Sequence, residues 1–140
     1  MTEEIQEYTE QILEQLGMDE SGYPDDHKIY HIDFGNELIV RYNDLDPGVY
    51  FNSDLVVLEE KNRESFLMSL MHLNLFGRGA QGAVFGYDEG IKQLTLSLAV
   101  PYRLKFKEFK NILEDFVNYI EFWKTELTKA QMGEKSVLND

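Results

Sequence analysis

The glycine-rich stretch "GRGAQGAVFG", residues Gly77–Gly86, has the spacing of a loop that could hold phosphate. Its glycines Gly77, Gly79 and Gly82 form G-x-G-x-x-G. A dinucleotide or P-loop site needs a strand before the glycines and a helix after them, because phosphate sits at the helix N-terminus. Here a helical pattern precedes the glycines and a strand pattern follows. A kinase would need H-R-D and a later D-F-G, but Asp33–Gly35 comes before the loop and H-R-D is absent. We therefore interpret the stretch as a turn that also ends a helix.

The histidines and aspartates also fall short of a site. His27 and His31 are four apart, but in a strand that spacing separates them by ~13 Å, too far to share one ion. Asp44 and Asp46 have calcium-loop spacing, but no glutamate closes a twelve-residue loop. There is no cysteine and no serine in G-x-S-x-G. We predict no catalytic site, no metal site and no cofactor, and hence no enzyme.

Composition restricts the partners. The 140 residues include 26 acidic and 13 basic ones, a formal net charge of -13. Nucleic acid and anionic membranes would be repelled by such a field, which leaves neutral or basic polypeptide as the natural partner. The absence of cysteine fits a reducing cytoplasm, and the acidic N-terminus lacks the features of a signal peptide. We expect a cytoplasmic protein.

The hydrophobic periodicity predicts an α+β chain. We expect helices at 2–16, 63–76 and 105–130, with strands at 27–34, 37–43, 49–60, 83–87 and 93–100. A glycine-first turn at Gly35-Asn36 would join the first two strands, and Asn52 to Asp54 could interrupt the third. We expect one domain over residues 1–130 and a frayed tail at 131–140.

The helix at 63–76 has apolar residues on more than one side. They cover an arc of roughly 220°, against the ~100° that a one-sided helix needs. These residues are Phe66, Leu67, Met68, Leu70, Met71, Leu73 and Leu75. Because so short a chain has little else to cover the second side, a second subunit is the simplest partner.

The last helix carries a continuous apolar stripe with a step of three or four. Its members are Phe106, Phe109, Leu113, Phe116, Ile120, Trp123 and Leu127. A coiled-coil seam would also show this step. A stripe with so many aromatic residues more often packs against a sheet.

The second half of the chain resembles the class I type III secretion chaperones, the CesT/SycE-like family of small acidic bacterial proteins. The resemblance lies in the order and spacing of elements over about residues 63–127: an apolar helix ending "LNLF", a glycine-containing loop, "GYDEGIKQLTLSLAVP" and a helix with "F..ILEDFVNYIEFW". Its residues are Asn74, Leu75, Phe76, Gly82, Tyr87, Asp88, Leu94, Leu96, Leu98, Pro101, Phe109, Leu113, Phe116 and Trp123. The chain departs from the family at "PYRLKF", where a leucine more often follows the proline directly.

The resemblance implies an α-β-β-β-α-β-β-α subunit whose twisted antiparallel sheet packs against helices. It implies a homodimer formed through the second helix and the following strand, with no catalysis and no ATP. On the residues of this chain, the dimer interface would be Phe66, Leu67, Leu70, Met71, Leu73, Asn74, Leu75, Phe76, Val84 and Phe85.

The family also implies a cargo, the N-terminal segment of a secreted effector, bound as an extended chain that must stay soluble and locally unfolded. Strand addition at a sheet edge, with pockets for alternate side chains, could hold such a chain. The candidate effector-binding residues are Ile5, Tyr8, Ile12, Tyr30, Ile32, Phe34 and Ile39. Core packing is the competing interpretation for each of them.

Three alternatives remain open from the sequence. The chain could be one subunit of a heterodimeric chaperone, paired with a paralogous subunit and serving a secretion-gate protein. It could be a small enzyme with a site built from His31, Asp33 and Arg41. It could also be a coiled-coil interaction protein that uses residues 106–127.

Overall fold

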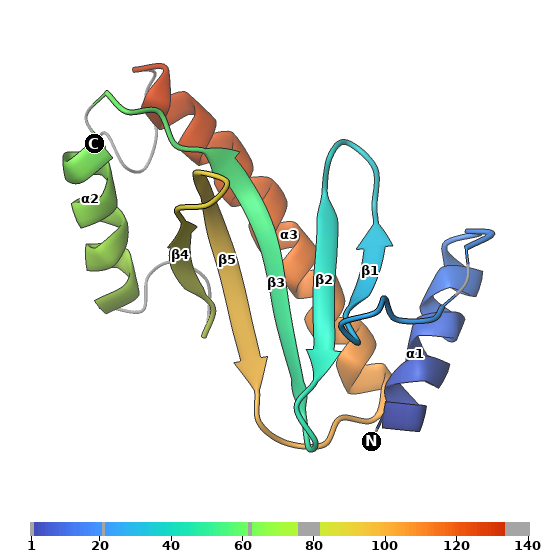
Figure 1. The fold of residues 1–140 in the computed structure, drawn as a ribbon. Helices are drawn as coiled ribbons and strands as arrows, with labels where there is room; N and C mark the ends of the chain where they lie inside the picture. Colours follow the sequence, from blue (N-terminus) through green and yellow to red (C-terminus); the bar gives the residue numbers. More distant parts are fainter. Residues whose placement is uncertain (1, 21, 62, 76–81, 134–140) are drawn as a thin grey trace. The chain divides into compact units, whose positions relative to one another are not determined.

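The fold is that of a computed structural model, which describes residues 2–20, 22–61, 63–75 and 82–133. Its helices and strands are α1 (Thr2–Gln15), β1 (Tyr30–Asp33), β2 (Ile39–Asp44), β3 (Val49–Val57), α2 (Arg63–Leu75), β4 (Val84–Asp88), β5 (Gln93–Val100) and α3 (Phe106–Gln131). Figure 1 shows them along the chain. The predicted order of elements is confirmed. Most of the glycine-rich stretch, residues 77–81, lies outside the described residues.

The strands form one five-stranded sheet in the order β1-β2-β3-β5-β4. The β1–β2, β2–β3 and β4–β5 pairs are antiparallel. The α+β class is therefore confirmed, and β1 and β4 are the two edge strands (Figure 1).

β3 is a single uninterrupted strand, so the break considered at Asn52–Asp54 is wrong. Buried and half-buried side chains alternate from Val49 to Val56, and the side chain of Ser53 is one of the buried ones. Strict alternation places Ser53 on the same face as Phe51 and Leu55, so the polar residues do not break the strand.

The turn between β1 and β2 also differs from the prediction. Asn36 and Glu37 both have positive φ, at 53° and 64°, and the Leu38 amide donates to the Gly35 carbonyl at 3.0 Å. These are the features of a type I′ turn centred one residue later than the glycine-first turn. Gly35, with a φ of 88°, precedes it.

The chain forms two compact units. Unit 1 comprises residues 1–52 and 99–117, and unit 2 comprises residues 53–98 and 118–140. Both β3 and α3 contribute residues to each unit. The single-domain interpretation stays a prediction.

An aromatic cluster around Phe109 forms the core of unit 1. The Phe109 ring lies 5.3 Å from that of Tyr42 and 5.7 Å from that of Phe51, and the ring of Phe116 lies 5.8 Å from Phe51. All four side chains are buried. The first half of the α3 stripe is therefore packed against β2 and β3.

In unit 2, the second half of the stripe is buried in the same way. The ring of Trp123 meets the ring of Phe85 edge-on, with centroids 5.1 Å apart. Ile120 and Leu127 are fully buried on the same helix. Because the stripe is covered within each unit, the coiled-coil alternative, which needs it exposed, is wrong.

The last residue of α3 is held by side-chain hydrogen bonds. Gln131 Nε2 donates to the Val57 carbonyl at 3.1 Å, and its Oε1 accepts from the Glu59 amide at 2.9 Å. The tail predicted from residue 131 therefore begins with an anchored residue. Residues 134–140 lie outside the described part of the chain.

We expect Phe109→Ala to lower the free energy of unfolding by ~3–5 kcal/mol, because it removes a fully buried ring from the centre of the unit 1 core. Urea denaturation followed by circular dichroism measures the change. Lys107→Ala, on the exposed side of the same helix, is the control and should stay within ~0.5 kcal/mol of the parent. A Phe109→Ala loss no larger than the control's would contradict this account of the core.

Candidate functional site

Among the described residues, histidine and acidic side chains do not form a cluster of the kind that a metal site needs. That part of the chain holds no cluster of three or more histidines, aspartates and glutamates able to bind a metal ion. His31 and Arg41 are opposite each other in the β1–β2 pair, but His31 bonds to Asp25 and Arg41 bonds to Asn52. Asp33 accepts from the Gly35 amide at 2.8 Å, so each of the three residues of the enzyme alternative already bonds to a neighbour of its own.

The predicted effector-binding residues divide by burial. Ile5, Ile12, Tyr30 and Ile32 belong to the core. Tyr8 and Phe34 are half-buried, and Ile39 is exposed. Effector contact by any of them stays a prediction, but only the last three offer side-chain surface to a partner in this conformation.

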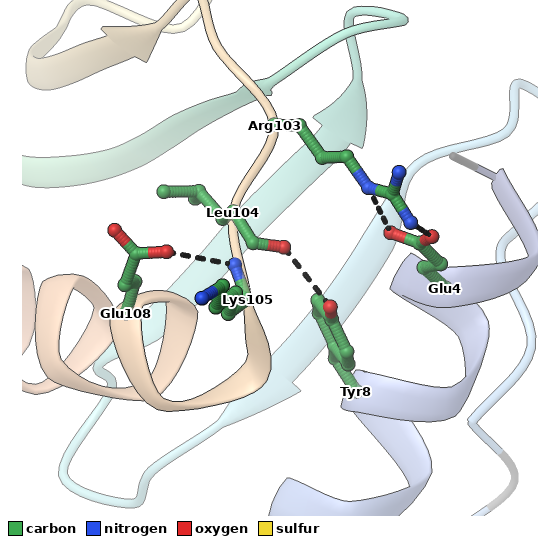
Figure 2. Close-up of polar contacts among 6 residues, drawn as sticks. All are labelled: Glu4, Tyr8, Arg103, Leu104, Lys105 and Glu108. Atoms are coloured by element: carbon green, nitrogen blue, oxygen red, sulfur yellow. Dashed lines mark hydrogen bonds and ion pairs between the residues drawn. The ribbon is translucent and has the colours of Figure 1, made fainter.

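Figure 2 shows how α1 is held against the segment that precedes α3. The Tyr8 hydroxyl donates to the Leu104 carbonyl at 2.9 Å, and both guanidinium nitrogens of Arg103 that face α1 bond to the Glu4 carboxylate. Burial raises the pKa of Tyr8, with a further contribution from the Glu4 charge. The Tyr8 hydroxyl therefore stays neutral and serves as an internal donor. Tyr8 was predicted to bind the effector, but its hydroxyl is already hydrogen-bonded to the Leu104 carbonyl within the chain.

The start of α3 is fixed beside this contact. Glu108, the third residue of the helix, accepts a hydrogen bond from the Lys105 amide at 3.0 Å (Figure 2). This is the returning half of a capping box, and it satisfies one amide at the helix start.

Inside unit 1, α1 is tied to β2 by a buried hydroxyl pair. Thr9 Oγ1 donates to the Ile5 carbonyl at 2.8 Å, so its contact of 2.5 Å with the Tyr42 hydroxyl must have Tyr42 as the donor. Burial raises the pKa of Tyr42, which keeps this donor protonated. Sequence periodicity pointed to the apolar face of α1 but gave no sign of this polar link, because Thr9 stands among glutamates and glutamines.

The predicted dimer residues also divide by burial. Leu70 and Phe85 are buried within unit 2, while Phe66 and Leu67 are half-buried. Met71 and Val84 are exposed, and so is Met68, which belongs to the apolar arc of α2 but not to the predicted interface. The side chains of Leu73, Asn74 and Leu75, and all of Phe76, lie outside the described residues. In this part of unit 2, α2 and β4 therefore leave apolar side chains uncovered.

The loop before β1 is organised by one carboxylate. Asp25 Oδ1 accepts from the amides of His27 and Ile29, at 2.8 and 3.0 Å, and its Oδ2 accepts from His31 Nε2 at 2.8 Å. These bonds, that of His31 first, lower the pKa of Asp25 to about 2. The loop that leads into the edge strand is therefore fixed by an ionised side chain.

No helix in the described ranges combines the length and the apolar composition needed to cross a membrane.

The sequence of the chain matches the model of one protein family. The family model described as the Tir chaperone protein (CesT) family matches residues 9–124. A search of curated protein sequences finds no significant match.

Solved structures share the fold. A chain of the ExsC–ExsE complex superposes with a TM-score of 0.68 at 18% identity, covering 89% of this chain and 94% of that one. A chain of the HopA1–SchA chaperone–effector complex gives 0.62 at 14% identity, covering 85% and 91%. YbjN from E. coli gives 0.54 at 15% identity, covering 79% and 84%. At these identities the likeness shows the fold alone.

The Asp25 bonds lead to a pH prediction. Since the pKa of this carboxyl is lowered in the folded chain, its contribution to stability is present above the ordinary value of 3.8 and is lost as the pH falls towards about 2. We expect the amide resonances of His27 and Ile29 to titrate with a midpoint near 2 in an NMR pH series.

Asp25→Asn is the control, because it keeps an oxygen acceptor but removes the titrating charge. That variant should lack the step at both amides. A midpoint close to 3.8 in the parent chain would show that the three hydrogen bonds are not held in solution.

Proposed function

Because the chain belongs to the Tir chaperone protein (CesT) family, we propose that it binds the N-terminal chaperone-binding region of a type III secretion effector and keeps that segment soluble and secretion-competent without ATP. The family consists of type III secretion chaperones rather than enzymes. The match over residues 9–124, which includes every strand of the sheet, carries this proposal. The bacterial cytoplasm, where an effector is made, is the proposed place of action.

Binding alone is sufficient for this role. A cargo segment that is kept unfolded exposes apolar side chains, which need shielding from water and from one another. An edge strand can accept an extended chain through backbone hydrogen bonds, and apolar surface beside it can accept alternate side chains. β1 is such an edge, with exposed Ile39 and half-buried Phe34 at the hairpin that it forms with β2.

The proposed subunit arrangement is a homodimer through α2 and β4. Met68 and Met71 on α2 and Val84 on β4 are 66%, 67% and 50% exposed, a high exposure for apolar side chains on two neighbouring elements. A second copy of the chain would cover them by a two-fold interface, in which the same patch serves both subunits. Methionine suits such a surface because its unbranched side chain adapts to a partner. A paralogous subunit, as in a heterodimeric chaperone for a secretion-gate protein, would use the same patch.

Co-expression tests the proposed function directly. The chain is expressed with N-terminal fragments of the secreted proteins encoded by the same organism, each fragment also being expressed alone. We expect at least one fragment to be soluble only with the chain and to co-elute with it in nucleotide-free buffer. If every fragment behaves identically with and without the chain, the proposal fails.

A substitution at Ile39 tests the cargo surface. We expect Ile39→Asp to weaken binding of such a fragment roughly tenfold, because a charge would replace an apolar contact of ~1–2 kcal/mol. Isothermal titration calorimetry measures the affinity. Ile91→Asp, in the β4–β5 turn, is a matched control, since Ile91 is 53% exposed and Ile39 41%. Equal affinities for the two variants would remove Ile39 from the cargo surface.

A second substitution tests the subunit arrangement. We expect the double variant Met68→Glu, Met71→Glu to have a mass of 16.4 kDa by light scattering, and the parent chain to have twice that mass. Both side chains are exposed in the subunit, so the variant should still fold. Met132→Glu, at a site that is 68% exposed near the end of α3, should leave the parent mass unchanged. A monomeric parent would instead indicate a heterologous partner.

A further inference from the structure

A hollow of about 690 Å³ lies where the edge strand β1 begins. β1 starts at Tyr30, which is paired with Tyr42, whereas β2 continues through Asn43 to Asp44. Before Tyr30 the chain forms the loop that Asp25 holds together and does not continue β1 along the end of β2. The last two residues of β2 therefore border a hollow.

The walls of this hollow combine apolar surface with carboxylates. Half-buried Pro24 and Ile29 provide apolar atoms, while Asp44 and Asp46 provide negative charge. Burial first, and then the charges of Asp44 and Glu10, raise the pKa of Tyr30.

Two basic residues, His27 and Lys28, also line the hollow, so the sign of the ligand depends on the wider field. Residues 1–52 and 99–117 of unit 1 contain 16 acidic and 6 basic residues, a net charge of 6 - 16 = -10. The rest of the chain has 10 acidic and 7 basic residues, a net charge of -3. The hollow thus lies on the strongly acidic unit, whose field attracts cations to it.

We propose that this hollow receives a lysine or arginine side chain from the extended cargo segment. The proposal rests on the proposed function, because it names the chemistry that this chaperone would select in its cargo. The aliphatic stem of such a side chain would lie along Pro24 and Ile29, and its cationic end would reach Asp44 and Asp46. Long basic side chains bury their stems on apolar surface in this way while the charged end stays hydrated.

NMR titration of the full ¹⁵N-labelled chain tests the proposal without any effector. The probe is the capped tripeptide acetyl-Val-Arg-Val-amide, and its neutral twin contains citrulline in place of arginine. A third peptide contains glutamate. We expect the arginine peptide to shift the amides of Lys28–Tyr30 and Asn43–Asp46, with saturation in the millimolar range, and the citrulline peptide to bind more weakly.

Variants separate charge from shape. We expect Asp44→Asn, Asp46→Asn to weaken the arginine peptide roughly two- to tenfold, the range for one or two partly exposed ion pairs. Asparagine at position 44 keeps an oxygen acceptor for the Asp46 amide, which bonds to Asp44 Oδ1 at 2.8 Å. Asp115→Asn, an exposed acid on α3 in the same unit, is the matched control and should leave the affinity unchanged.

Three results would overturn the proposal: equal binding of the citrulline peptide, stronger binding of the glutamate peptide, or shifts confined to other residues. None of them bears on whether the chain solubilises an effector fragment. Conversely, if co-expression fails but the arginine peptide binds as described, the hollow stands as a basic-peptide site and the chaperone role falls.

Discussion

Packing of the α3 aromatic stripe against the sheet is the interaction on which the rest of the structure depends. In unit 1, Phe109 and Phe116 contact the rings of Tyr42 and Phe51, and in unit 2 Trp123 contacts Phe85. Each buried ring contributes a large apolar area together with a defined edge or tilted geometry. These contacts bury one face of the strands and the apolar stripe of α3. A partner must therefore bind to the surfaces that stay exposed.

In unit 1, the contacts of α1 with its neighbours determine which surface is exposed to a partner. Its apolar side chains Ile5 and Ile12 are buried, and hydrogen bonds from Tyr8 and Tyr42 fix the helix to its neighbours. A cargo chain therefore cannot use the inner face of α1 without displacing the core. It would meet the exposed edge at β1, the hairpin around Ile39 and a surface with a large excess of carboxylates.

Unit 2 presents a different surface, with less charge and more uncovered methionine. One side of α2 is buried within the unit, and another side is exposed. Leu70 packs inward, whereas Met68 and Met71 face outward. A helix of this kind is costly to expose alone in water, which is why we propose a second subunit over it. The contrast between a strongly acidic unit and a unit with a smaller net charge and exposed methionines is consistent with cargo and subunit contacts on separate parts of the chain.

The sequence by itself determined the order of helices and strands, because hydrophobic periodicity and turn residues act over a few positions. It also argued against a phosphate loop and a metal site, and it identified the family through the spacing of its second half. The tertiary structure alone decided which apolar residues are surface and which are core. Ile32 and Ile39 look alike in sequence, but one is buried and the other exposed, since strand register and turn geometry place them on opposite sides. The hydrogen bonds between Thr9 and Tyr42 and from Gln131 to Val57 of β3 join residues that are 33 and 74 positions apart in the sequence. The hollow likewise brings the loop before β1 together with the end of β2. Such long-range contacts leave no periodic signal, because they depend on how separate elements pack.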